Sequence, residues 1–229
     1  MNPKKLAKEL GADLIGIADL DELRDYPTSP DSLLDGYRRG ISLGARLTDP
    51  AIDNLPESRP LYAHQYRKVN EELDRISYRL AKAIEKYGFK AQPLPASEII
   101  SDAHWRSYIS HKAVARAAGL GWIGKSLLLV NPDFGPRIRW ATVLTDMELE
   151  AGAPLENKCG TCIDCIEGCI VNAFEDAGFD DYPDDRNEYF DVDGCAEKLE
   201  EFAKDPNIGS MVCGICIKVC PWGKNTARS

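Results

Sequence analysis

Eight cysteines, all in the last third of the chain, are the residues whose type and spacing most clearly predict chemistry. The first four form one run, in which two residues separate the first three cysteines and three residues precede the fourth: Cys159, Cys162, Cys165 and Cys169. Two-residue gaps let consecutive thiolates and the backbone between them curl around one iron–sulfur cube. The run therefore predicts ligands of a 4Fe-4S cluster.

The other four cysteines are spaced differently. Cys213, Cys216 and Cys220 form a second run, followed by Pro221, and Cys195 stands alone upstream. In bacterial two-cluster ferredoxins the fourth cysteine of the C-x2-C-x2-C-x3-C run ligates the other cluster. If the same swap holds here, each of two 4Fe-4S clusters receives four cysteines. One set is Cys159, Cys162, Cys165 and Cys220, and the other is Cys169, Cys195, Cys213 and Cys216.

Two other uses of cysteine are weaker interpretations. Structural zinc favours two C-x2-C pairs per ion, which three cysteines at two-residue gaps fit poorly. The N-terminal segment has no signal-peptide pattern, since Asp13, Asp19 and Asp21 interrupt its apolar stretch, and no segment is long enough to span a membrane. We therefore expect a cytoplasmic protein, in which clustered cysteines are metal ligands or redox groups rather than disulfides.

The charge balance is acidic, with a formal net charge of −9. No global positive field would therefore draw the chain to nucleic acid or to an anionic membrane. Carboxylates are concentrated between residues 175 and 205. Such a run is usually a solvated face, and the alternative is a docking patch for a basic electron donor.

The composition changes near Ala151, because every cysteine follows it. We predict a mixed α/β domain over residues 1–150 and a ferredoxin-like domain over 151–229, an α+β protein overall. Apolar periodicity predicts a helix over 60–87 whose apolar face lies on a sheet, and a second helix over 110–119. Strands are expected at 12–18, 40–47, 89–95, 126–130 and 138–146, with turn signals suggesting a hairpin between the last two.

Residues 119–126, GLGWIGKS, match the P-loop pattern for phosphate binding. A P-loop needs a strand before it and a helix after it, whereas here a helix precedes and an extended segment follows. Three glycines around Trp122 could instead let the backbone approach a large flat ligand. The structural alternative is a tight helix-to-strand turn with Trp122 in the core.

Several segments together resemble the epoxyqueuosine reductases and, more distantly, the reductive dehalogenases. They are HKAVARAAGLGWIGKSLLLV at 111–130, ATVLTD at 141–146, CGTCIDC at 159–165, the lone Cys195 and CGICIKVCPW at 213–222. The resemblance implies an N-terminal domain that holds cobalamin, two clusters that feed it electrons, and reductive cleavage of a substrate. The residues that it places near the cofactor are Gly119, Gly121, Trp122, Gly124, Lys125 and Ser126.

The resemblance also implies a general acid upstream of the glycine motif. Asp102 and Tyr108 are the candidates for protonating the departing group. His111, in the family-like segment, could touch the ligand, while the scattered His64 and His104 form no metal site with it.

The partners follow from the same comparison. A low-potential electron donor of the ferredoxin or flavodoxin type is expected, with a small molecule or a corrinoid protein as substrate. The tRNA-modifying members continue into a helical-repeat domain, whereas this sequence ends at Ser229, which together with the acidic balance disfavours tRNA. Two rival hypotheses are a pure electron carrier and a reductive activator of a partner corrinoid protein.

Overall fold

The computed structural model describes residues 1–100 and 107–224. The chain forms two compact units, and each is assembled from several segments. The sheet unit comprises Met1–Ala45, Val69–Gly121 and Arg139–Leu155, and the cysteine unit comprises Arg46–Lys68, Trp122–Ile138 and Glu156–Ser229. The domain boundary expected at residue 151 stays a prediction, and the compact units divide the chain differently, since two earlier segments belong to the cysteine unit.

A four-stranded sheet forms the centre of the sheet unit, in the order β1-β2-β6-β3. Its strands are β1 (Leu14–Asp19), β2 (Arg39–Arg46), β6 (Ile138–Thr145) and β3 (Ala91–Leu94). β1 pairs antiparallel with β2, so that Ile17 lies opposite Ile41, and β3 pairs antiparallel with β6. The mixed α/β fold is confirmed, and all four strands lie in segments where apolar and β-branched residues predicted them.

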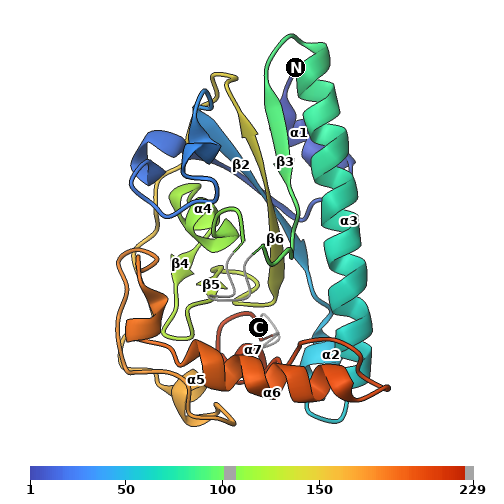
Figure 1. Ribbon diagram of the computed structural model, residues 1–229, viewed down its shortest axis with the longest axis vertical. Coiled ribbons are helices and arrows are strands. Elements are labelled where there is room, and N and C mark those ends of the chain that lie inside the picture. The colour runs from blue at the N-terminus through green and yellow to red at the C-terminus, as the bar shows by residue number, and fades with distance from the viewer. Residues whose placement is uncertain (101–106, 225–229) are drawn as a thin grey trace, which may run out of the picture. The chain divides into compact units, whose positions relative to one another are not determined.

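One long helix, α3 (Arg59–Lys86), runs beside the sheet, as Figure 1 shows in green-blue. Within the sheet unit its apolar stripe is fully buried, as expected from the three- and four-residue spacing of Leu73, Ile76, Leu80 and Ile84. These side chains share a core with Ile17, Ile41 and Leu43 from the sheet. The interface therefore buries every second residue along the strands, on the sheet face that meets α3.

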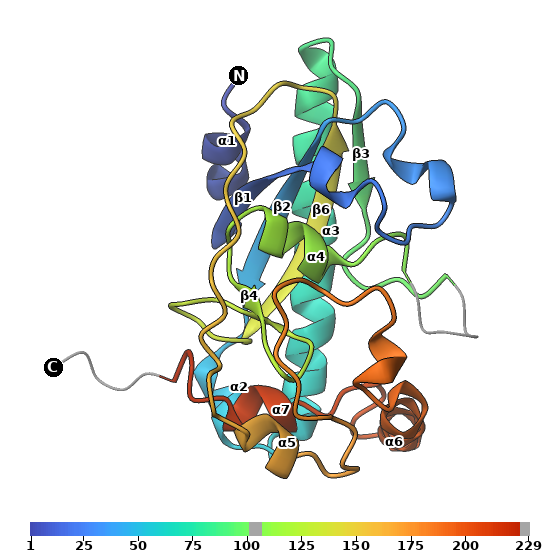
Figure 2. The ribbon, with the colours of Figure 1, turned by 90° about the vertical axis from the view of Figure 1, so that its left-hand side faces the viewer.

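Helix α4 (His111–Ala117) covers the other face of the sheet, opposite α3 (Figures 1 and 2). The strand residues that face α4 are small, because a Cβ at Gly16 would lie 2.8 Å from the carbonyl oxygen of Ala118, and one at Gly40 would lie 3.0 Å from Val114. Ser110 caps α4, since its side chain accepts a hydrogen bond from the Ala113 amide. Close approach to the sheet thus positions the segment that leads into residues 119–126.

Short elements complete the sheet unit. The first is α1 (Pro3–Glu9), whose N-terminus is capped by Asn2. Two 3-10 helices, Leu20–Leu23 and Asp31–Leu34, connect β1 to β2. No helix in the described part of the chain combines the length and apolar character needed to cross a membrane.

Short helices and one small hairpin build the cysteine unit. The helices are α2 (Asp49–Asp53), α5 (Asp164–Glu167), α6 (Val192–Lys204) and α7 (Ile215–Val219), with a 3-10 turn at Arg186–Glu188. The hairpin pairs β4 (Trp122–Ile123) with β5 (Leu129–Val130), as Gly124 donates to the Leu128 carbonyl. The predicted hairpin between 126–130 and 138–146 is therefore wrong, because β5 takes the unpredicted β4 as its partner while β6 joins the large sheet.

A buried ion-pair network ties together early and later segments of the cysteine unit. Arg137 is fully buried, and its guanidinium donates to Asp49 at 3.0 Å and to Asp53 at 2.6 Å. A buried cation requires such partners, because desolvation would otherwise cost several kcal/mol. The network holds α2 against the segment that precedes β6.

Candidate metal centres

Four cysteines line one cavity in the cysteine unit. They are the first set predicted from the spacing: Cys159, Cys162, Cys165 and Cys220. The cavity is completed by Gly124, Lys125, Ser126, Val130, Pro221 and Trp222. Cys165 lies in α5 and Cys220 directly follows α7. The two helices pack closely, because a Cβ at Gly168 would lie only 3.0 Å from Val219. Tertiary packing thus brings Cys220 to the first cysteine run.

Asn157 holds the start of this run in place. Its side-chain amide donates to the carbonyl oxygens of Ile123 and Phe179, at 2.8 and 2.9 Å, and its oxygen accepts from the Cys159 amide at 2.9 Å. The Asn157 side chain therefore connects the β4–β5 hairpin, the first cysteine run and the loop that contains Phe179. The sequence analysis did not select this residue, although an asparagine two residues before Cys159 is a turn signal that could have found it.

The other four cysteines also approach one another. Cys169 accepts a hydrogen bond at its sulfur from the Ala173 amide, and the Ala173 carbonyl accepts from Asp191. The rings of Phe174 and Phe190 stack beside this contact. Asp191 caps α6, which carries Cys195 in its first turn. These contacts join residues 173–174 to residues 190–191, and they thereby bring the lone Cys195 to Cys169.

The thiol pKa values reflect the same grouping. Burial raises the pKa of Cys165, Cys195 and Cys220 to about 11. Neighbouring sulfurs add to the effect: Cys159 and Cys162 for Cys165, and Cys169 and Cys213 for Cys195. The pKa of Cys216 is also raised, first by burial and then by Cys213 and Cys195, with smaller contributions from Cys165 of the first set and from Cys169. Iron must displace these protons on binding, because thiolate is the ligating form.

The cysteine spacing does not fit a single metal ion. Within residues 1–100 and 107–224, no three His, Cys, Asp or Glu side chains gather closely enough to share one ion. A zinc site requires four ligands at about 2.3 Å from a common centre. In a 4Fe-4S cluster each thiolate binds a different iron, so the sulfurs stand further apart. Three cysteines at two-residue gaps suit such a cluster better than the two C-x2-C pairs of a structural zinc site.

Residues 119–126 are divided between a helix end and the cysteine cavity. Gly119, with a φ of 76°, follows the C-cap of α4, and a Cβ there would lie 2.6 Å from the Ala153 carbonyl oxygen. A Cβ at Gly124 would lie 2.8 Å from Val130 and 3.6 Å from the Cys159 sulfur. At these two glycines the close approach is therefore made by the chain itself. Gly121 precedes β4, and the next element after Ser126 is strand β5 rather than a helix, so the described residues lack the P-loop context.

Trp122 and Lys125 are both buried. The Trp122 ring meets that of Trp222 edge to face, with centroids 4.9 Å apart. Lys125 forms an ion pair of 2.5 Å with Asp176. The sequence analysis used Trp222 only as part of the family-like segment, and nothing in the sequence singled out Asp176, because its partner Lys125 lies 51 residues earlier in the chain.

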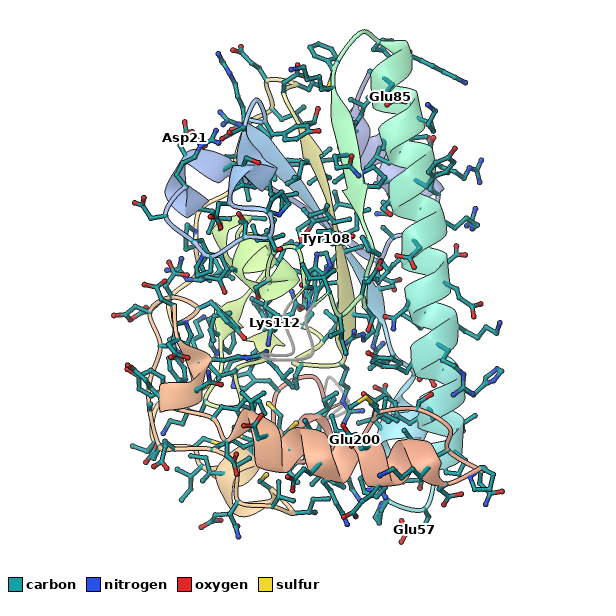
Figure 3. The ribbon with its side chains drawn as sticks, in the orientation of Figure 1. Asp21, Glu57, Glu85, Tyr108, Lys112 and Glu200 are labelled. Atoms are coloured by element: carbon teal, nitrogen blue, oxygen red, sulfur yellow. The ribbon has the colours of Figure 1, made fainter. Side chains whose placement is uncertain are left out.

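Asp102 and Tyr108 are the two predicted general acids. Asp102 lies outside the described residues, and its role stays a prediction. Tyr108 is partly buried in the segment that enters α4, labelled in Figure 3, and its carbonyl oxygen accepts from the Ser29 amide. The roles of both residues remain predictions.

His111 is held inside the sheet unit by hydrogen bonds at both ring nitrogens. One nitrogen, Nε2, lies 2.8 Å from the Pro95 carbonyl, and Nδ1 lies 2.8 Å from the Thr142 hydroxyl. A carbonyl only accepts, so Nε2 carries the proton and Thr142 donates to Nδ1. Burial lowers the pKa of His111 to about 4, with Arg139 contributing. Both nitrogens are thus used by the protein, which leaves none for a ligand.

This histidine predicts a pH dependence of stability. The unfolded chain binds the His111 proton near pH 6.5 and the folded chain only near 4, so stability falls as the pH falls between these values. From pH 7.5 to 5.5 the loss should be about 1.4 kcal/mol. Anaerobic urea unfolding of wild type and His111→Gln at both pH values measures it, and His64→Gln, at an exposed position, is the control. Equal pH dependence in wild type and His111→Gln would contradict the assignment.

Comparisons with known proteins agree with this arrangement. Residues 158–223, which hold all eight cysteines, match the 4Fe-4S double cluster binding domain. The epoxyqueuosine reductase of Aliivibrio fischeri is 26% identical, with 97% of this chain and 66% of the relative aligned. That of Leadbetterella byssophila is 28% identical, over 96% and 78% respectively, and that of Synechocystis sp. is 32% identical, over 61% and 50%. The chain thus spans between half and four fifths of these relatives.

Solved structures share the fold. A catabolic reductive dehalogenase in complex with 3-bromo-4-hydroxybenzoic acid aligns with a TM-score of 0.74 at 21% identity, covering 97% of this chain and 31% of that one. Epoxyqueuosine reductase from Streptococcus thermophilus aligns with a TM-score of 0.59 at 20% identity, covering 96% and 65%. The chain is thus an iron–sulfur protein with a 4Fe-4S double cluster binding domain, and it resembles the epoxyqueuosine reductases over nearly its whole length.

Proposed function

We propose that this chain is an iron–sulfur reductase that passes electrons from two 4Fe-4S clusters to a bound cobalamin, for reductive cleavage of a substrate. One observation carries the proposal. Three residues of the family-like stretch at 119–126 line the same cavity as four cluster cysteines: Gly124, Lys125 and Ser126. A pure electron carrier needs no such motif beside its cluster. Bound cobalamin would supply a cobalt centre that takes up electrons and breaks a bond in the substrate.

The chain's own residues would hold and insulate the two clusters. In our assignment, Cys159, Cys162, Cys165 and Cys220 hold the first. The second is held by Cys169, Cys195, Cys213 and Cys216. Buried Val130 lines the first cavity, and apolar groups beside a cluster limit solvent access and so affect its potential.

Trp122 supports a bound group near the motif. Its indole N–H is buried and has no hydrogen-bond partner among residues 1–100 and 107–224. Leaving such a donor unpaired costs about 1–3 kcal/mol, so an acceptor on a bound group would recover that energy. Its neighbour Trp222 lines the cluster cavity, which makes the tryptophan pair a candidate contact between cluster and cofactor.

Substrate and partners belong to the proposal as well. One solved reductive dehalogenase is described as suggesting a mechanism for B12-dependent dehalogenation, and one epoxyqueuosine reductase is described with a modified tRNA stem loop. The net charge of −9 favours a small molecule or a corrinoid protein over tRNA for this chain. A low-potential ferredoxin or flavodoxin would supply electrons, and Asp102 or Tyr108 would protonate the departing group.

Anaerobic titration with cobalamin tests the proposal. Protein with both clusters reconstituted should retain cobalamin on gel filtration, and electron paramagnetic resonance should show cobalt with its lower base detached. Trp122→Phe, which keeps the aromatic ring but removes the N–H, should bind cobalamin several-fold more weakly at unchanged iron content. Full clusters without any retained cobalamin would overturn the proposal in favour of an electron carrier, and reduction of cobalt only on an added corrinoid protein would favour the activator.

A further inference from the structure

Lys125 places a buried positive charge at the wall of the first cluster cavity. Its side chain is 8% exposed and lines the cavity together with Cys159, Cys162, Cys165 and Cys220. The adjoining Gly124 lies close to one of these cysteines, since a Cβ at Gly124 would lie 3.6 Å from the Cys159 sulfur. The backbone therefore carries the lysine directly past the cysteines.

Asp176 is the partner of this lysine. Its carboxylate lies 2.5 Å from Nζ, and its side chain is 61% exposed. The two members of the pair are thus in different surroundings, because water screens the carboxylate but reaches little of the ammonium group. Lys125 lines the cavity and Asp176 is not among its lining residues, so the better-screened carboxylate should not fully cancel the lysine charge there.

A charge in this position acts on reduction. When the cluster takes one electron from a low-potential donor, its net charge becomes more negative by one, and no bond forms or breaks. A buried cation stabilises the reduced state more than the oxidised state, and a buried anion has the opposite effect. Net charge and solvent exposure are among the factors that set cluster potentials.

We propose that Lys125 raises the reduction potential of the cluster held by Cys159, Cys162, Cys165 and Cys220, and that Asp176 partly offsets it. This inference rests on the assignment of these four cysteines to one cluster within the proposed function. Lys125 does not bind iron in this proposal; its charge stabilises the reduced cluster electrostatically. The pair sets how readily this cluster gives its electron to the next acceptor.

A redox titration of the full chain, followed by electron paramagnetic resonance, tests the proposal. Lys125→Gln should lower the ratio of reduced to oxidised first cluster about tenfold at a fixed solution potential, which is about 59 mV for one electron. Lys125→Arg keeps the charge and should stay close to wild type. Asp176→Asn should shift the same cluster in the opposite direction. The second cluster, whose cysteines lie outside this cavity, should not shift in any variant.

Two exposed residues provide matched controls. Lys158→Gln removes the same charge one residue from Cys159, and Glu175→Gln removes a carboxylate next to Asp176, both from exposed side chains. Neither should shift the potential comparably. A shift in Lys125→Gln no larger than in Lys158→Gln, or equal shifts of both clusters, would overturn the proposal.

If Lys125→Gln fails to assemble its cluster, the Asp176→Asn variant decides, since it leaves the lysine intact. An unchanged or lowered potential in that variant would overturn the proposal. Failure here is distinguishable from failure of the proposed function, because cobalamin retention is measured separately from potential. Loss of cobalamin binding with the expected shifts would leave Lys125 as the charge that tunes an electron carrier.

Discussion

Exchanging Cys195 for serine is expected to remove one of the two clusters and leave the other intact. The iron content should fall by about half, because Cys169, Cys213 and Cys216 lose their fourth thiolate while the first set keeps all four. Iron and sulfide analysis combined with electron paramagnetic resonance of the reduced protein measures this result. The signal of one cluster should vanish, and that of the other should keep its potential.

The physical basis is the contact between Asp191, at the start of α6, and Ala173. Asp191 donates its amide to the Ala173 carbonyl, at 2.8 Å, and its side chain caps α6. The first turn of α6 thereby presents Cys195 to Cys169, across a sequence separation that no local pattern specifies. Cys220→Ser is the reciprocal variant and should remove the first cluster. Loss of the first cluster in Cys195→Ser would contradict the division into two interleaved sets.

Replacing Gly135 with alanine should prevent stable assembly of the first cluster. The Gly135 φ is 56°, and a Cβ there would lie 2.0 Å from the Trp222 carbonyl oxygen and 2.5 Å from its carbonyl carbon. Backbone atoms cannot rotate away as a side chain can, so residues 222–223 would have to move. This segment immediately follows Cys220 and Pro221, which line the cluster cavity. We expect a loss of more than about 3 kcal/mol, as overpacking and a strained φ combine.

Gly160 offers a closely matched control. Its φ is 53°, and it lies between Cys159 and Cys162, yet apart from its two chain neighbours no atom of the described residues lies within 4 Å of its Cβ position. Gly160→Ala should therefore cost only the left-handed conformation, about 1–2 kcal/mol, and keep its cluster. Thermal unfolding and iron content of the two variants measure the difference. Equal losses would show that backbone strain alone, and not the contact with Trp222, explains Gly135.

Much of the fold was predictable because the local pattern of apolar residues indicates where helices and strands form. The stripe of Leu73, Ile76, Leu80 and Ile84 predicted the long helix and its burial on a sheet, since a 3.6-residue repeat directs these side chains to one side. Strand β2 was recognisable from its alternating apolar residues Ile41, Leu43 and Ala45. The pairing of β5 was not, because β4 has only two residues and its partner was chosen by tertiary contacts rather than by composition.

The candidate site was also predictable only in part. Sequence alone determined the ligand type, the number of cysteines and the spacing within each run, because two-residue gaps confine thiolates to one local curl of backbone. An analogy with ferredoxins suggested the two interleaved sets. Only the tertiary structure brought Cys220 and Lys125 to one cavity with the first run, and drew Cys195 to Cys169. Such contacts arise from helix packing and loop closure between distant segments, which the spacing of neighbouring residues does not encode.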